Sequence, residues 1–259
     1  MRSLQRTFNS VIHVVVLSLF FAGLTFALDV EETTIKEDPS AVKYKCNIVR
    51  KVEIPKHYHE GIYLTDDQIW VANGEDGKVW AFDLKTGALL NEIAPVSTFT
   101  EAVTDGPDHS LYTTDWDEKK LYRVSIKDGK FLPDWEASFD PAFPAGCVWD
   151  GKNFLVITWT RGVFGTRFHL LTVAIDGNVI GRARFATFQE PAHCAWDGSS
   201  LWVTSWYDGH VYQVDVKSNM IAGSFKAPVE RLTGIAWDGR YFWLTGTDDD
   251  LYQVEVSLK

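Results

Sequence analysis

The chain has 259 residues, of which 46% are hydrophobic and 23% charged, a composition typical of globular proteins and unlike that of a disordered chain. With 25 Lys and Arg against 35 Asp and Glu, the formal net charge is −10. This balance and the lack of any Lys/Arg cluster exclude a nucleic-acid partner, which would need a basic face for its phosphates. The aromatic content is unusual, with 11 Trp, 9 Tyr and 16 Phe. So many rings must fill a large β core or be displayed at a site.

Residues 1–27 have the pattern of a secretory signal peptide. Two arginines precede a short apolar stretch, and Thr25 and Ala27 are the small residues of a cleavage site. The alternative is an uncleaved anchor, because the apolar run 11–28 is long enough to span a bilayer. Cleavage predicts an exported chain, secreted or periplasmic, without a membrane span. Residues 28–44 are polar and acidic with no strand or helix period, and we expect them to form a flexible leader.

A repeat of about 40–50 residues organises the rest of the chain. Three copies contain a Trp-Asp-Gly turn, at 149–151, 196–198 and 237–239, each followed by an aromatic strand pattern. A complete copy contains four strand patterns, and no amphipathic helix pattern occurs, which is typical of a β-propeller blade. Two degenerate copies lie upstream, so that the five equivalent strand starts are Glu60, Glu101, Ala145, Ala192 and Thr233.

The two ends of the repeat region predict how the ring closes. The fifth copy stops after its third strand, and residues 47–54, just before the first copy, have the pattern of a fourth strand. An N-terminal strand that completes the last blade would leave no exposed sheet edge there. We therefore expect residues 45–259 to form one all-β domain, a five-bladed β-propeller closed in this way.

The geometry of a blade predicts which residues meet. Its first two strands are antiparallel, so the start of one and the end of the other lie at the same mouth of the ring. An aromatic-lined concavity with a few convergent polar groups is the usual form of a ligand site. The tryptophans of the Trp-Asp-Gly turns belong to the opposite end and are expected to be packing residues. The residues expected at the mouth are Glu60, Glu101, His193, Trp116, Trp159, Trp206 and Arg161.

Cysteine and histidine residues give no firm sign of a disulfide or a metal site. Cys147 and Cys194 occupy positions that hold Ile or Val in other blades, which favours inert core thiols over a disulfide or a reactive thiol. His57 and His59 lie on one strand face and offer two metal ligands, but no third follows at a fixed spacing. We expect no metal and no cofactor.

Two segments resemble the glutaminyl-peptide cyclotransferases of plants and bacteria. The stretch 98–104, followed by 111–124, is similar to the second blade of that family. His59-Glu-Gly-Ile62, followed by 80–87, is similar to its first blade. The family fold is a five-bladed propeller, in agreement with the repeat count. The resemblance implies an enzyme that cyclises N-terminal Gln to pyroglutamate and releases ammonia without a metal.

The resemblance also implies roles for individual residues. Glu101 falls on the family's catalytic Glu, which moves a proton from the substrate's α-amine to the departing ammonia. Trp116 falls on an aromatic residue of the substrate pocket. The sequence departs from the family pattern in four places: Ala102 stands in place of a Gly, Glu60 replaces a Gln, the family's Glu-Gly-Trp-Gly-Leu appears only as Glu190-Pro-Ala-His-Cys194, and its Asn-Glu-Leu-Glu segment has no counterpart. The other expected mouth residues, with Glu60, are assigned to substrate binding.

Two other classes of function remain open. An exported propeller without catalytic activity would use the same aromatic mouth to bind a peptide, a sugar or a protein partner. A propeller lyase or lactonase would need a divalent metal. In every case we expect a monomer with a peptide or small-molecule ligand at the mouth.

Overall fold

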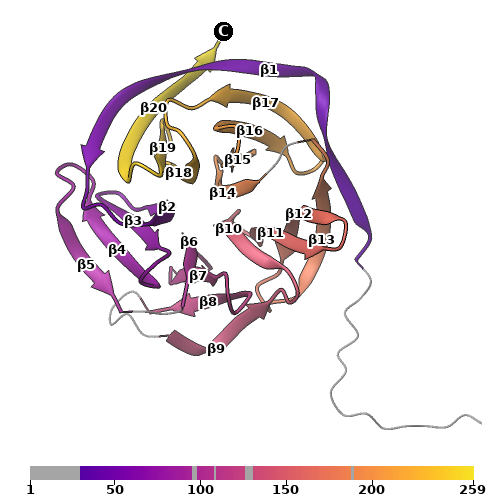
Figure 1. Cartoon of the computed structure of the whole chain (residues 1–259), viewed down its shortest axis with the longest axis horizontal. Helices are drawn as coiled ribbons and strands as arrows, with labels where there is room; N and C mark the ends of the chain where they lie inside the picture. Colours follow the sequence, from indigo (N-terminus) through magenta and orange to yellow (C-terminus); the bar gives the residue numbers. More distant parts are fainter. Residues whose placement is uncertain (1–29, 95–97, 108, 126–130, 188–189) are drawn as a thin grey trace, which may run out of the picture.

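The computed structural model describes residues 30–94, 98–107, 109–125, 131–187 and 190–259. The predicted signal peptide, 1–27, lies outside the described residues. Within them the chain forms β-strands arranged as five blades around a central axis (Figure 1). Among these residues no helix is long and apolar enough to cross a membrane.

Each blade is an antiparallel sheet of four strands whose first strand lies nearest the axis. The predicted fold class, an all-β five-bladed propeller, is confirmed. The blades are β2–β5 (His59–Leu64, Gln68–Asn73, Lys78–Asp83, Leu89–Ile93), β6–β9 (Thr100–Asp105, Leu111–Asp115, Lys120–Val124, Phe131–Ser138), β10–β13 (Phe143–Trp149, Phe154–Gly162, Gly165–Val173, Val179–Phe185), β14–β17 (Pro191–Trp196, Leu201–Ser205, His210–Asp215, Met220–Lys226), and β18–β20 (Leu232–Trp237, Phe242–Gly246, Asp250–Leu258) with β1 (Glu32–Glu53).

The cores of the protein lie between neighbouring blades. In β3, Ile69 and Val71 pack toward the fifth blade, whereas Trp70 and Ala72 pack toward the second. Because alternate residues of a strand point to opposite faces and both faces are covered, the strand is a continuous apolar run. Five such clusters, one at each blade junction, hold the ring together.

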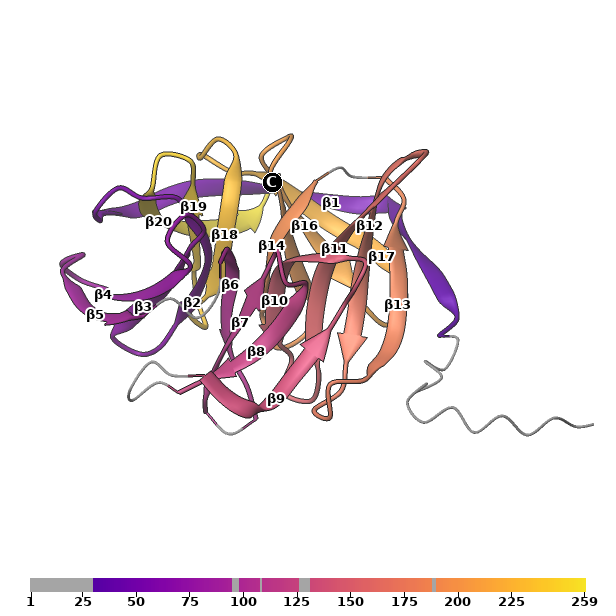
Figure 2. The ribbon, with the colours of Figure 1, turned by 60° about the horizontal axis from the view of Figure 1, so that its bottom comes forward.

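Strand β1 closes the ring and extends well beyond the fifth blade. Its second half pairs antiparallel with β20, from Tyr44↔Leu258 to Glu53↔Asp250, as predicted. Its first half runs along the outer rim and pairs in parallel with β13 and then β17 (Figures 1 and 2). The expectation of a flexible leader over 28–44 is therefore wrong for residues 32–44. Ile35 is fully buried in the cluster between the third and fourth blades.

The Trp-Asp-Gly turns follow one hydrogen-bond scheme. In the fourth blade, Asp197 Oδ1 accepts from the backbone N–H groups of Ser199 and Ser200 at 2.8 and 2.7 Å, and Oδ2 accepts from the indole of Trp202 at 2.7 Å. Asp238 repeats this scheme in the fifth blade. The Asp side chain thus satisfies the turn backbone and fixes the aromatic residue of the next strand.

The glycine of each turn is required by backbone conformation and not by space. Gly198 has φ of +97°, yet a Cβ placed on it meets nothing within 4 Å. We expect Gly198→Ala to lower the free energy of unfolding by about 1–2 kcal/mol, because an L side chain disfavours this backbone region. Urea denaturation measures the change. Gly162→Ala is the control, since Gly162 is also uncrowded but lacks a positive φ; equal losses in the two variants would contradict the explanation.

Candidate functional site

Glu60 and Glu101 occupy equivalent places in the first and second blades. In every blade the pairing of the first two strands shifts register at this point, as in a β-bulge, and such bulges re-aim side chains. Glu60 and Glu101 are therefore set at the mouth by an irregularity that the alternating pattern does not reveal. The shifts lie between His59 and Ile62, Thr100 and Ala102, Pro144 and Gly146, Pro191 and Cys194, and Leu232 and Gly234.

The two carboxyl groups lie close enough to influence each other. Burial, followed by the charge of Asp249, raises the pKa of Glu60 to about 8. Burial, followed by the charges of Glu60 and Asp117, raises the pKa of Glu101 well above its usual value. Glu60 is only 8% exposed. Glu101 is half-buried. A pair of carboxyls with raised pKa values holds a proton near neutral pH, as proton transfer to and from a substrate requires.

These shifts predict how stability depends on pH. An unfolded Glu loses its proton near pH 4.3, whereas Glu60 keeps its proton in the folded state up to about pH 8. Between these values the native state binds more protons, so stability falls as pH rises, by ~1.4 kcal/mol per pH unit for one such group. We expect Glu60→Gln to reduce this fall. Urea denaturation of the wild type and of Glu60→Gln at pH 5.5 and 7.5 measures the two changes in the free energy of unfolding. The same pH dependence in both proteins would contradict the raised pKa of Glu60.

The residue that follows the strand start is small in four of the five blades and is a histidine in the fourth blade. These residues are Gly61, Ala102, Gly146, His193 and Gly234. A Cβ on Gly61 would lie 2.3 Å from His193 Nε2, so the glycine makes room for the histidine. His193 was predicted to bind substrate at the mouth. The structure instead buries it on the axis, at 1% exposure.

The protonation state of His193 follows from its surroundings. Burial lowers its pKa to about 4, so the imidazole is neutral at pH 7. Nδ1 lies 3.3 Å from the Ile235 carbonyl oxygen, which can only accept, so Nδ1 carries the hydrogen. Nε2 is then a lone pair and has no hydrogen-bond partner among the described residues. His193 is therefore a neutral, buried side chain that separates the mouth from the opposite end of the central axis.

Two of the three predicted mouth tryptophans lie together. Trp116 and Trp159 meet edge to face with centroids 5.6 Å apart, and Trp116 also packs on Phe143 at 5.0 Å. The Arg161 guanidinium lies 5.9 Å from the Trp116 ring centre and 5.1 Å from that of Phe143. Both tryptophans are half-buried and also pack against the core between the third and fourth blades. Trp116 and Trp159 therefore help to pack the junction between the third and fourth blades and also line the rim of the mouth.

The third predicted tryptophan, Trp206, belongs to a different part of the rim. Its ring lies 4.8 Å from the guanidinium of Arg231, which comes from the connection leading into the fifth blade. Trp159, by contrast, is tied to the fourth blade, because its indole donates to the Pro191 carbonyl at 2.7 Å. Of the three tryptophans expected at the mouth, two therefore form a contacting pair, and the third packs against an arginine instead.

A cavity of about 330 Å³ opens between the first and fifth blades, beside Glu60. Its polar groups include Asp249, whose charge raises the pKa of Glu60, and Tyr58, whose pKa is raised by burial and then by Glu60 and Glu101. Tyr58 packs against Phe99, with centroids 6.1 Å apart. The cavity is lined by Lys56, His57, Tyr58, His59, Glu75, Thr233, Thr247 and Asp249.

Sequence reasoning missed Tyr58 and Asp249. Tyr58 lies between the two histidines considered as metal ligands, and Asp249 belongs to an acidic run, 248–250, at a hairpin of the fifth blade. The backbone N–H of His59 donates to Asp249 Oδ1 at 3.2 Å, so the hairpin is fixed against the first blade. The acidic run 248–250 was the sequence feature that could have marked Asp249 as a site residue. Its position beside Glu60, however, follows only from the contact between the fifth and first blades.

Burial governs the state of His59 and of two of the three cysteines. Burial lowers the pKa of His59 to about 4. In the described part of the chain, no group of three or more His, Cys, Asp or Glu is arranged to hold a metal ion. Cys46, Cys147 and Cys194 are free; the last two are fully buried, and burial raises the pKa of both. This arrangement matches the expectation of inert core thiols.

Comparisons with known proteins relate the chain to propellers through its fold. No family model and no curated protein matches it. It resembles the crystal structure of glutaminyl cyclase from Myxococcus xanthus with a TM-score of 0.69 and 14% identity, over 85% of this chain and 99% of that one. It resembles the PQQ-bound aldose sugar dehydrogenase of Streptomyces coelicolor with a TM-score of 0.51 and 15% identity, over 84% and 100%. At such identities these likenesses show the fold alone.

Proposed function

We propose that this chain is a glutaminyl-peptide cyclotransferase, which converts an N-terminal Gln to pyroglutamate with release of ammonia. The observation that carries the proposal is the pair of carboxyls, Glu60 buried and Glu101 half-buried, which start equivalent strands at bulges and have raised pKa values. The fold of a bacterial glutaminyl cyclase supports it. The exported location expected from residues 1–27 fits peptide substrates that pass through a secretory route.

The reaction needs orientation and one proton shuttle. The α-amine nitrogen of the substrate attacks the side-chain amide carbon, a ring C–N bond forms, and the bond to the amide nitrogen breaks. Glu101, protonated at the start, gives its proton to the departing nitrogen, which leaves as ammonia, and takes up the proton that the attacking amine loses. Because nucleophile and electrophile belong to one residue, holding the chain in a folded pose supplies much of the rate.

Other residues at the mouth have binding roles in this proposal. Asp249 attracts the amino terminus by its charge, and Glu60 accepts a hydrogen bond from it through its carbonyl oxygen. The cavity beside Tyr58 receives the residues that follow the Gln, and Trp116 with Arg161 forms the facing rim. The neutral His193 below the carboxyls excludes water from the axis without adding a positive charge that would lower the pKa of Glu101.

The test is a direct assay of turnover. The protein is incubated with short Gln-initiated peptides in the presence of EDTA, and loss of ammonia is followed by mass spectrometry. We expect a rate above that of spontaneous cyclisation in matched buffer. No turnover across peptides that differ at the second and third residues would overturn the proposal and favour a propeller that only binds its ligand.

A further inference from the structure

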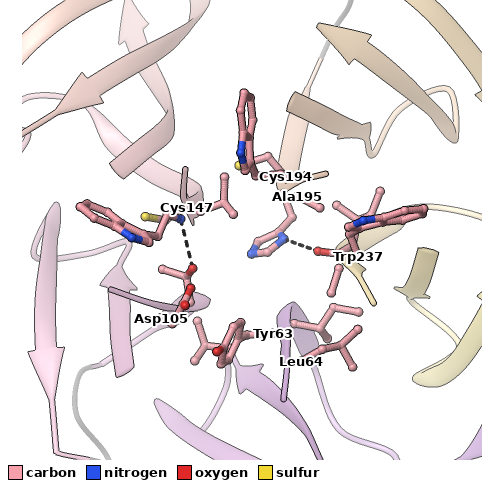
Figure 3. Close-up of a pocket in the computed structure, with 16 residues that line it drawn as sticks. Tyr63, Leu64, Asp105, Cys147, Cys194, Ala195 and Trp237 are labelled. Atoms are coloured by element: carbon pink, nitrogen blue, oxygen red, sulfur yellow. Dashed lines mark hydrogen bonds between the residues drawn. The ribbon is translucent and has the colours of Figure 1, made fainter. Parts of the chain in front are cut away.

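A second cavity lies on the axis at the opposite end from the mouth, below His193. Its volume is about 110 Å³, and the ends of the first strands of all five blades line it (Figure 3). We call it the lower cavity, defined by Tyr63, Asp105, Trp149, Trp196 and Trp237. The three tryptophans are those of the Trp-Asp-Gly turns, which were expected to be packing residues. They do pack, but each is half-buried and also lines this cavity.

The lower cavity offers hydrogen-bond donors without partners. The indoles of Trp202 and Trp243, one strand further along, donate to the turn aspartates. Within the described residues, the indole N–H groups of Trp149, Trp196 and Trp237 have no acceptor and are not sealed from solvent. An indole nitrogen can only donate. Three donors around one cavity therefore fit a ligand that presents several acceptors.

One acidic group lines the same cavity as these donors. Asp105 is the only charged side chain among the described residues that line the lower cavity, and it lies beside Tyr63 (Figure 3). Burial, followed by the charge of Asp105, raises the pKa of Tyr63 to about 12. A carboxylate accepts several hydrogen bonds, so Asp105 can accept them from a ligand.

The rings of the cavity are held in place by neighbouring aromatic residues. Trp149 packs on Phe154 at 4.8 Å and Trp237 packs on Phe242 at 4.5 Å between ring centroids. Their free edges and faces are thus fixed before a ligand arrives, which lowers the entropic cost of binding. The cavity, at about 110 Å³, has room for only part of a small cyclic ligand, and it opens to solvent at the end of the propeller.

The chemistry of this lining discriminates among ligand classes. An anion would be repelled by Asp105. A quaternary ammonium ion would be attracted to the rings, but it carries no acceptor and would leave the indole donors unpaired. A neutral polyol ring accepts from the indoles through its hydroxyl oxygens, donates to Asp105 through a hydroxyl hydrogen, and packs its C–H surface on the aromatic rings.

We propose that the lower cavity is a carbohydrate-binding site for the exposed edge of a neutral pyranose. This site lies apart from the carboxyls at the mouth and does not depend on the activity proposed for them. The test uses isothermal titration calorimetry of the full chain with methyl pyranosides of glucose, galactose and mannose and with N-acetylglucosamine. Tetramethylammonium chloride and sodium acetate are the comparison ligands.

Two variants separate the donors from the acceptor. Trp196→Phe keeps an aromatic ring but removes one N–H group, and we expect it to weaken binding by about three- to tenfold. Asp105→Asn removes the charged acceptor with little change in shape, and we expect a loss of about 10- to 100-fold. Glu92→Gln, at an exposed position of the outer strand β5, is the control and should bind the sugar as the wild type does.

The outcomes decide the proposal. Saturable binding of at least one pyranoside, weakened in both variants and kept in the control, would establish the site. Absence of binding by every pyranoside, or equal affinity in both variants and the wild type, would overturn it. Binding of tetramethylammonium without any pyranoside would overturn the ligand class. Thermal unfolding of each variant shows whether its fold is intact.

Discussion

Replacing Glu101 by Gln is expected to reduce the rate of ammonia release from Gln-initiated peptides by about 10²–10⁴-fold, the usual contribution of a general acid–base group. The amide keeps the shape of the side chain but neither takes nor returns a proton at neutral pH. Initial rates of the wild type and the variant, measured at saturating peptide, give the ratio.

A matched control accompanies this variant. Glu92→Gln removes an exposed carboxyl on the outer strand β5, where it pairs with Lys78 at 2.8 Å, and should leave the rate unchanged. Glu60→Gln should retain turnover but shift its pH profile, because Glu60 raises the pKa of Glu101. Full turnover in Glu101→Gln, or loss of turnover in Glu60→Gln alone, would contradict the assigned roles.

Replacing Ile35 by Ala is expected to lower the free energy of unfolding by about 2–4 kcal/mol, the usual cost of truncating a fully buried aliphatic side chain. Ile35 is 0% exposed and packs in the core between the third and fourth blades. Ile48→Ala, on the same strand but at a side chain that is 49% exposed, is the control and should cost much less. Urea denaturation measures both.

This pair of variants examines whether the N-terminal half of β1 is part of the folded domain. A flexible leader would tolerate either change equally. Equal and small effects would therefore contradict the parallel pairing of residues 32–37 with β13 and β17. A large effect confined to Ile35→Ala would show that the segment contributes to the stability of two blades it does not belong to.

Much of the fold could be predicted from the sequence because the repeat is explicit. The Trp-Asp-Gly turns set the period, and the missing fourth strand of the last copy pointed to residues 47–54 as its replacement. Residues 32–44 could not be recognised in this way. They pair with outer edge strands and lie mostly at the surface, with Ile35 their one fully buried side chain, so no period of apolar residues marks them as a strand.

The candidate site was predicted less completely than the fold. Glu60 and Glu101 were found because they start equivalent strands. The position of His193, one residue further on, depends on how narrow the axis is and on the small side chains around it, which strand patterns do not reveal. Asp249 reaches Glu60 only because the fifth blade meets the first, a contact between residues far apart in the chain. Trp206 is separated from the other two tryptophans by its contact with Arg231.

The pairing of β1 with β20 has a consequence for how the protein reaches its native state. The contacts that complete the fifth blade join Glu53 to Asp250 and Tyr44 to Leu258, so they span nearly the whole domain. All-β proteins with many non-local pairings fold slowly, because loop-closure entropy must be lost before such contacts form. We therefore expect the fifth blade, which is complete only when the two ends of the domain meet, to make the folding of the ring slow.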